Sequence, residues 1–337
     1  MPYTKAEPNG RAKDRRSFLK LATAAGAGLA TPGIARAQHT YPDHSIRIIV
    51  PFAPGGPTDI IARLISVPMS AALGQPVVVE NRPGAGGNIG IAAAARAAPD
   101  GYTLLVTSSA YVVNPSLYRN VPYDAFKDFA PVAELGTSPN IILANPAAGI
   151  TSLGDLVSKA KTAPGRLSYA SPGAGTTPHL AGELLKIRAG IDVLHVPFNG
   201  AGPAIQAVLA GTTQIASTAL PPAQPQVKSG SLRGLAVTGE TRWPDLPDVP
   251  TAEEAGVPGL VSETFQAMLA ANGTPPAVLE RLSRVAIDIL KQPAMQVRLQ
   301  EAGFAVLARG PDALTRRIAT EVPMWRDVIK ESGINVE

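Results

Sequence analysis

The chain has 337 residues, of which 45% are hydrophobic and 17% are charged, and it contains no cysteine. That length suits about two ordinary domains. The 32 glycines and 33 prolines predict many turns, but their share lies below the roughly 25–30% that marks a disordered chain. The lack of cysteine excludes a disulfide framework, a thiolate nucleophile and zinc or iron–sulfur centres held by cysteine.

Residues 15–37 have the features of an export signal. Arg15 and Arg16 precede Ser-Phe-Leu-Lys, a mildly apolar run over 21–34 and an Ala-x-Ala pattern that ends at Ala37. This order predicts a leader of the twin-arginine type that is cut after Ala37, with the mature protein in the periplasm. The run over 21–34 contains glycine and proline and is too short to span a membrane, which takes about 20 apolar residues.

Removal of this leader changes the charge of the protein. The whole chain has a formal net charge of +4, but residues 1–37 carry seven basic and two acidic side chains. The remaining 23 basic and 24 acidic side chains give a net charge of −1. A nearly neutral mature chain gives no support for a nucleic-acid partner or for an anionic membrane surface. No later segment has the pattern of a membrane span.

From residue 46 onward, short β-branched runs alternate with longer Ala- and Leu-rich runs. This alternation is typical of βαβ units and predicts an α/β fold with a largely parallel sheet. The expected strands are 46–50, 77–80, 102–107, 141–144, 167–170, 193–196, 215–218, 232–238, 265–270 and 304–308. The expected helices are 59–72, 89–98, 153–162, 179–187, 203–210, 222–229, 276–291, 295–302 and 312–331.

A proline-rich stretch over 243–250 interrupts the alternation. We interpret it as a surface loop that ends a second domain, because one strand-like run and three helical runs follow, too little for a third domain. These last segments are expected to complete the first domain. The prediction is therefore two lobes joined by two chain crossings around a cleft, with 38–138 plus 265–337 in lobe 1 and 139–264 in lobe 2.

The first expected strand leads through a loop rich in glycine and proline into an amphipathic helix. Glycines let the backbone approach a ligand, and the free N–H groups and positive dipole end of the helix favour an anion. The same glycines also fit a tight turn that binds nothing, and the spacing does not separate the two. The candidate ligand residues of this loop are Phe52, Pro54, Gly55, Gly56, Pro57, Thr58 and Asp59.

A second loop of the same design joins a strand to a helix in the other half of the chain. Two helix N-termini on opposite sides of a cleft would hold one small carboxylate between them. Three or four such hydrogen bonds suit roughly micromolar binding, about −8 kcal/mol, without an arginine. We interpret His179 as a support for this loop. The candidate ligand residues here are Ser171, Gly175, Thr176 and Thr177.

Other loops at the carboxyl ends of strands are expected to line the same cleft. They add Ser108, Ser109, Asn199 and Thr218 as candidates. Any single hydroxyl among them is more readily explained as a cap or turn residue. The glycines over 84–90 depart from the dinucleotide-binding fingerprint and are interpreted as a turn and helix start.

Enzymatic and metal chemistry find little support. The sequence has neither a G-x-S-x-G elbow nor a G-x-x-x-x-G-K-[ST] loop. The four histidines are scattered, and His195 fits a core position in a strand. Asp59 could act as a general base by its position, but no nucleophile or partner acid is identifiable. No catalytic residue, metal ligand or cofactor is expected.

Several long motifs carry a resemblance to a known family. Pro54-Gly55-Gly56-Pro57-Thr58-Asp59, the run VVVENRPGAGG over 77–87, APDGYTL over 98–104 and LPDVPT over 246–251 resemble the Bug-type extracytoplasmic solute receptors. These are the substrate-binding proteins of tripartite tricarboxylate transporters. The resemblance runs from about residue 41 to residue 333.

The resemblance implies a class II periplasmic-binding-protein architecture and a monomer that closes over a small carboxylate. It implies delivery of a dicarboxylate, tricarboxylate or aromatic carboxylate to a transporter permease, and no nucleic-acid partner. In the family the two loops at 52–59 and 171–177 grip the ligand carboxylate. Two other functions stay open: a receptor that signals to a sensor kinase, and an exported hydrolase or isomerase that uses Asp59 and a loop hydroxyl.

The chain departs from the family pattern at three positions. An acidic residue on the ligand side is replaced by Thr218, which favours a ligand without an ammonium group. Phe265 stands where tryptophan is frequent and Glu263 where a small residue is usual. Both changes are expected to reshape the far end of the pocket.

Overall fold

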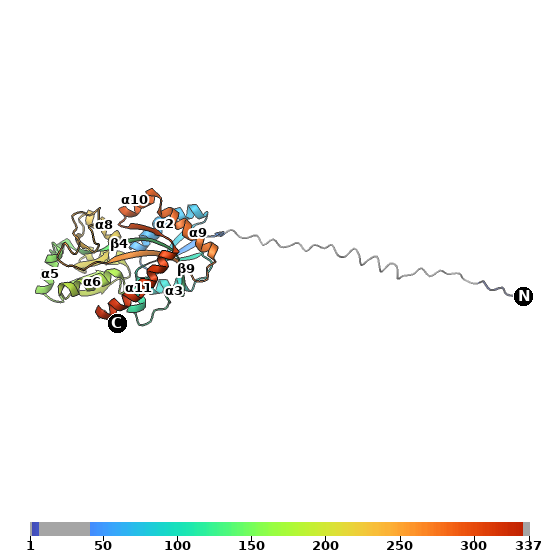
Figure 1. Ribbon diagram of the computed structural model, residues 1–337, viewed down its shortest axis with the longest axis horizontal. Helices are drawn as coiled ribbons and strands as arrows, with labels where there is room; N and C mark the ends of the chain where they lie inside the picture. Colours follow the sequence, from blue (N-terminus) through green and yellow to red (C-terminus); the bar gives the residue numbers. More distant parts are fainter. Residues whose placement is uncertain (1, 7–40, 333–337) are drawn as a thin grey trace. The chain divides into compact units, whose positions relative to one another are not determined.

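The computed structural model describes residues 2–6 and 41–332 (Figure 1). The predicted leader over 1–37 lies outside the described residues, apart from residues 2–6, and stays a prediction. Residues Met1–Thr40 and Tyr41–Glu337 are separate units. The fold and the site described below belong to the second unit.

Strands and helices alternate through most of this unit, as the sequence pattern predicts. The strands are β1 (Ile46–Val50), β2 (Val77–Asn81), β3 (Thr103–Ser108), β4 (Phe129–Ala144), β5 (Ser168–Ser171), β6 (Leu194–Pro197), β7 (Ile215–Ala219), β8 (Arg233–Val237), β9 (Glu263–Ala271) and β10 (Ala305–Arg309). The helices are α2 (Pro57–Leu73), α3 (Asn88–Ala95), α4 (Ala110–Leu117), α5 (Leu153–Thr162), α6 (Thr177–Ala189), α7 (Ala201–Leu209), α8 (Leu220–Lys228), α9 (Pro276–Leu290), α10 (Pro293–Glu301) and α11 (Pro311–Ser332). Two single-turn 3-10 helices, Ala85–Gly87 and Pro146–Ala148, lie in loops.

The long strand β4 takes part in two portions of one sheet. Its residues from Phe129 to Pro139 pair with β9 and in part with β10, whereas those from Asn140 to Ala144 pair with β7 and β8. The first sheet portion therefore contains β2, β1, β3, β9, β4 and β10, and the second contains β8, β4, β7, β5 and β6. β1, β2 and β3 are parallel to one another, as are β5, β6 and β7, and the pairs with β4 and β9 are antiparallel.

Helices cover both faces of each sheet portion (Figure 1). Hydrophobic cores lie between the helices and the sheet on each face. In the first portion, α2, α9 and α10 pack on one face, and α3, α4 and α11 pack on the other. In the second portion, α5 and α6 pack on one face, and α7 and α8 on the other. This layering places the carboxyl ends of the parallel strands, and the loops that follow them, at the edge where α/β proteins bind ligands.

Local sequence accounts for the helices. In α9 the buried residues Leu282, Ala286, Ile289 and Leu290 recur at the three- and four-residue spacing of one helix face. In α5 the hydroxyl of Ser152 accepts a hydrogen bond of 3.1 Å from the backbone N–H of Asp155, which caps the N-terminus of the helix. Patterns of this kind explain why the expected and observed elements agree to within a few residues at most positions.

Two elements differ from expectation. Helix α4 was not predicted, and β4 begins at Phe129, twelve residues before the expected strand at 141. The division into lobes 1 and 2 stays a prediction, and the distribution of the hydrophobic clusters over residues 46–135 with 265–318 and over residues 141–260 agrees with it. Among the described residues, no helix combines the length and the apolar character needed to cross a membrane.

Candidate ligand-binding site

A small cavity lies where the loops after β1, β3, β5, β6 and β7 meet. Its volume is about 20 Å³, which is room for about one water molecule. It is lined by Phe52, Gly56, Pro57, Thr58, Ser108, Pro172, Thr176, Thr177, Pro178, Ala201, Ala219 and Thr264. None of these lining side chains is charged, so any electrostatic preference of the cavity must come from the backbone and from hydroxyl dipoles.

Helix N-termini gather around this cavity. Helices α2, α6 and α7 begin at the lining residues Pro57, Thr177 and Ala201. Helix α8 begins at Leu220, directly after the lining residue Ala219. The first N–H groups of a helix have no partner within the helix, and each helix carries a partial positive charge at this end. The arrangement therefore makes the cavity electropositive without a cationic side chain.

The N-terminus of α2 has no side-chain cap. The N-cap residue Gly56 makes no side-chain hydrogen bond, and Pro57 lacks an N–H group. A methyl group built on Gly56 would lie 3.7 Å from the backbone nitrogen of Ala201. The loop before α2 therefore lies beside the start of α7, with room for one methyl group but little more between them.

Asp59 holds the first loop in place. Its carboxylate accepts hydrogen bonds from Gly55 N at 3.0 Å, Arg63 Nε at 3.0 Å and Asn81 Nδ2 at 2.9 Å. Burial alone would raise the pKa of the Asp59 carboxyl, but these hydrogen bonds and the positive charge of Arg63 lower it below its ordinary value of 3.8. An ionised carboxylate that is fully engaged in this way stabilises the loop and is a poor general base.

The second loop rests on two stacked histidines. The imidazole of His195 hydrogen bonds through Nε2 to Ser171 Oγ at 2.6 Å, and His179 Nδ1 accepts from Gly175 N at 3.3 Å. The two rings stack with centroids 4.2 Å apart. Burial lowers the pKa of His179 to about 4. Burial, followed by the charges of His179 and Lys186, lowers the pKa of His195 to about 3, so both rings are neutral at pH 7. The contact with Gly175 N agrees with the expected role of His179 as a support for this loop.

Direct hydrogen bonds join the loops on the two sides of the cavity. The N–H of Ala53 donates to the carbonyl oxygen of Asn199 at 2.9 Å. The hydroxyl groups of Thr177 and Thr264 hydrogen bond to each other, and Thr264 donates to Asn140 Oδ1 at 2.8 Å. The Ala53–Asn199 bond connects segments of the two predicted lobes, whereas Thr177, Thr264 and Asn140 all belong to predicted lobe 2. The first contact therefore closes the predicted cleft at this point.

The structure separates the predicted site residues into two groups. Those that line the cavity are Phe52, Gly56, Pro57, Thr58, Ser108, Thr176 and Thr177. Those that lie behind or between the loops are Pro54, Gly55, Asp59, Ser109, Ser171, Gly175, Asn199 and Thr218. For example, Ser109 Oγ accepts a 2.9 Å hydrogen bond from Phe265 N, and Asn199 contributes its backbone oxygen.

Sequence reasoning missed some of the lining. Pro172, Pro178, Ala201, Ala219 and Thr264 also line the cavity. Pro172, Pro178 and Ala201 stand in loops that were singled out, but small and apolar residues carry no chemical signal. Thr264 stands just before the expected strand at 265, and nothing in the sequence places it near the other loops.

The structure places Glu263 and Phe265 away from the small cavity, and their effect on the ligand stays a prediction. Both lie in a separate open groove of about 670 Å³ that α11 borders. There the guanidinium of Arg317 lies 4.8 Å from the centre of the Phe265 ring. Thr218 is fully buried, and its hydroxyl donates to the carbonyl oxygen of Ala219 at 3.1 Å.

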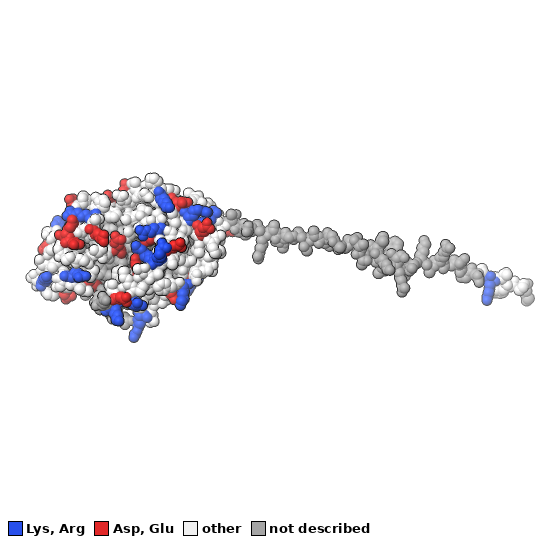
Figure 2. All heavy atoms as spheres, in the orientation of Figure 1, with Lys and Arg blue, Asp and Glu red and all other residues white. Residues whose placement is uncertain are grey.

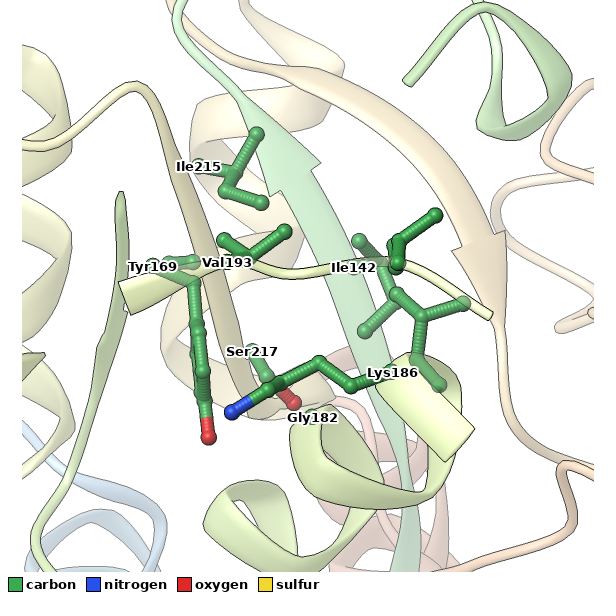
Figure 3. A pocket seen from close by; sticks show the side chains of 10 residues that line it. Ile142, Tyr169, Gly182, Lys186, Val193, Ile215 and Ser217 are labelled. Carbon is green, nitrogen blue, oxygen red and sulfur yellow. The ribbon is translucent and has the colours of Figure 1, made fainter. Parts of the chain in front are cut away.

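Other features of the described residues are less suited to a ligand site. A cavity of about 10 Å³ lies inside the second sheet portion, where Figure 3 shows Tyr169, Val193 and Ile215 around it and Lys186 stretched alongside. Acidic and basic side chains are interspersed on the face shown in Figure 2. The described residues include no group of three or more His, Cys, Asp or Glu side chains that could hold a metal ion.

An α/β fold of two helix-covered sheet portions, with helix N-termini around a closed cavity, defines the class of solute-binding receptors. Residues 61–334 match the family described as "Tripartite tricarboxylate transporter family receptor". The chain belongs to this family, which consists of binding receptors and not of enzymes. The hydrolase or isomerase alternative is therefore not carried forward.

Relatives across nearly the whole chain agree with this assignment. Protein BugT of Bordetella pertussis is 36% identical over 325 residues, which cover 95% of this chain and 100% of BugT. Rpa4515 of R. palustris, solved with adipate, is 33% identical with a TM-score of 0.85, covering 88% of this chain and 99% of its own. MatC of Rhodopseudomonas palustris, solved with malate, is 34% identical with a TM-score of 0.82, covering 86% of this chain and 100% of its own. The predicted fold class and family are confirmed.

Proposed function

We propose that this protein is a periplasmic receptor that binds a small carboxylate in the cavity between its two lobes and delivers it to a tripartite tricarboxylate-type permease. The observation that carries the proposal is the convergence of the N-termini of α2, α6, α7 and α8 on one cavity without charged lining residues. The adipate and malate bound to the two relatives are carboxylates of the same kind.

The chemistry of the cavity suits such a ligand. Helix N-termini supply N–H donors and a positive potential, each helix contributing about 0.3–2 kcal/mol. The hydroxyls of Thr58, Ser108 and Thr177 can add directed hydrogen bonds, and Phe52 and Pro57 can pack against the carbon chain of the ligand. No acidic side chain lines the cavity to pair with an ammonium group, which favours a carboxylate without an amino group.

Binding requires the cleft to open. A cavity of about 20 Å³ is far smaller than the roughly 300 Å³ or more of ordinary ligand pockets. The ligand therefore enters an open form, and the helix ends on both sides reach it only after closure. Because the ligand contacts both sides only in the closed form, it shifts the population toward that form. The permease then recognises the closed, loaded receptor.

The experiment is isothermal titration of the purified protein with adipate, malate, an aromatic carboxylate and the dimethyl ester of adipate. We expect saturable binding of at least one carboxylate with a Kd of roughly micromolar order and none of the neutral ester. An ester that binds as tightly as the acid would contradict a site built for an anion.

Transport is tested separately from binding. A strain that lacks the gene should lose uptake of the radiolabelled carboxylate that binds in vitro, and a plasmid copy should restore it. If uptake is normal but transcription no longer responds to that carboxylate, the receptor serves a sensor kinase, the alternative that the sequence left open.

A further inference from the structure

Gln266 lies in the middle of β9 and is fully buried. Neither its amide nitrogen Nε2 nor its amide oxygen Oε1 has a hydrogen-bond partner among the described residues. Other buried amides are better satisfied, since Asn114 and Gln224 each lack a partner only at the oxygen. A buried amide without partners is unfavourable, and proteins keep one where water or a ligand completes it.

The strand register places Gln266 beside the cavity. In the antiparallel pair of β3 and β9, Gln266 stands directly opposite Ser108, so the two side chains leave the sheet on the same face. Thr264, two residues earlier on β9, shares that face by the alternation of strand side chains. Ser108 and Thr264 both line the cavity. The Gln266 amide therefore adjoins the cavity wall on the side that these two residues form.

A second unpartnered group faces the same region. The hydroxyl of Thr58, in the first turn of α2, is buried, lines the cavity and has no hydrogen-bond partner in the described part of the chain. On its other flank, Gln266 is paired with Gly136 of β4, which has no side chain. A methyl group built on Gly136 would lie 2.9 Å from the backbone oxygen of Ala305 and 3.6 Å from Ile61 Cδ1, so this flank is closed. The Gln266 amide can therefore be reached only from the cavity side, past Ser108 and Thr264, when the cleft opens.

The hydrogen-bonding capacity of the Gln266 amide limits which ligand group can pair with it. The Gln266 side chain offers an N–H donor and a C=O acceptor side by side. A carboxylate is only an acceptor and would leave the amide oxygen facing a negative charge. A hydroxyl or a carboxamide is both donor and acceptor, so either can pair with both atoms of the amide.

We propose that Gln266 recognises a neutral hydroxyl or carboxamide on the ligand, so that the receptor prefers carboxylates that carry such a group over plain dicarboxylates of the same length. This inference rests on the proposed function and names the ligand class for that site. The carboxylate is held at the helix N-termini, and the neutral polar group extends to the Gln266 amide.

The test compares pairs of acids that differ only in that group. Malate is compared with succinate, and adipate monoamide with adipate, by calorimetric titration of the wild-type protein and of Gln266→Met. Methionine keeps the length of the side chain and removes both hydrogen-bonding atoms. Gln300→Met, on an exposed position of α10, is the matched control.

We expect the wild-type protein to bind one hydroxyl- or amide-bearing acid at least tenfold more tightly than its parent. In Gln266→Met this ratio should fall to about one, whereas the Kd of the parent acid should change less than threefold. Gln300→Met should keep the wild-type ratio. Equal affinity within both pairs in the wild type, or a ratio that survives Gln266→Met, overturns the inference while the carboxylate site itself stands.

Two further readouts keep the outcomes separate. If none of the four acids binds but an aromatic carboxylate does, the inference fails and the proposed function stands; if no carboxylate binds, both fail. If Gln266→Met does not fold, the crystal structure of the wild-type protein with the tighter acid decides. A hydroxyl or carboxamide within hydrogen-bond distance of Gln266 supports the inference, and an amide bonded only to internal water overturns it.

Discussion

The hydroxyl of Tyr118 donates a hydrogen bond of 2.8 Å to the carbonyl oxygen of Ala174. Tyr118 directly follows α4 in predicted lobe 1, and Ala174 lies in the loop before α6 in predicted lobe 2. Around this bond the backbones are in close contact, because a methyl group built on Gly86 would lie 2.3 Å from the same oxygen. In the open form that we propose this bond is broken, so the bond would contribute to the free energy of closure.

We therefore expect Tyr118→Phe to weaken ligand binding without unfolding the protein. Loss of one neutral hydrogen bond removes about 1 kcal/mol from the closed form, which raises Kd about fivefold. Titration calorimetry measures this change. The control is Tyr123→Phe, which removes a hydroxyl bonded to the carbonyl oxygen of Tyr111 inside lobe 1. That variant should lose stability and keep its affinity. An unchanged Kd in Tyr118→Phe would show that closure does not depend on this bond.

Substitutions at Gly56 test whether a larger side chain at this position blocks ligand binding. A single methyl group meets Ala201 and Ala53 only at 3.7–3.9 Å, which is ordinary van der Waals contact. Gly56→Ala should therefore keep its affinity within a few-fold. Gly56→Val adds two methyl groups where the loops meet, and overpacking of about 1–3 kcal/mol should weaken binding at least tenfold. Both variants should unfold in urea at nearly wild-type concentrations. Strong binding by Gly56→Val would place the ligand elsewhere.

Thr58→Val should have opposite effects on stability and on binding. The Thr58 hydroxyl is buried without a partner, so its replacement by a methyl group should leave the free energy of unfolding of the unliganded protein unchanged or raise it by up to about 1 kcal/mol. The same change removes a hydrogen bond to ligand and should raise Kd about fivefold. Urea denaturation and calorimetry measure the two quantities. If Thr58→Val loses stability but binds the ligand normally, the hydroxyl stabilises the folded protein and does not contact the ligand.

The stacked histidines predict a dependence of stability on pH. The folded-state pKa values are about 4 for His179 and about 3 for His195, below the ordinary value of about 6.5. Between pH 6.5 and about pH 4 the unfolded chain binds more protons than the folded protein. The free energy of unfolding is therefore highest above pH 6.5 and decreases as the pH falls toward 4. His179 alone should lower the free energy of unfolding by about 2 kcal/mol between pH 7 and pH 5.

Urea denaturation at pH 7 and pH 5 measures this loss. His195→Gln, which removes one of the two titrating rings, should make the dependence shallower. Equal stability of the wild-type protein at the two pH values would contradict the inference that both rings are buried in the neutral form.

The order of strands and helices followed from local patterns, and the exceptions have physical causes. Helix α4 is only eight residues long, contains Pro115 and is mostly buried, so it has little of the amphipathic pattern that marks a surface helix. The first part of β4 contains Pro131, Gly136 and Pro139, residues that usually indicate turns. Pairing with β9 on one side and β10 on the other overrides that local preference.

The sequence by itself determined the α/β class and the places of the two glycine-rich loops that precede helices, because helix starts and turns depend on nearby residues. Only the tertiary structure decided which side chains line the cavity. Neighbouring strand residues point to opposite faces, so Ala219 lines it while Thr218 does not. Thr264 and Gln266 come from a strand more than a hundred residues from the first loop. Their place beside Ser108 depends on the register of β9 against β3, which no local pattern contains.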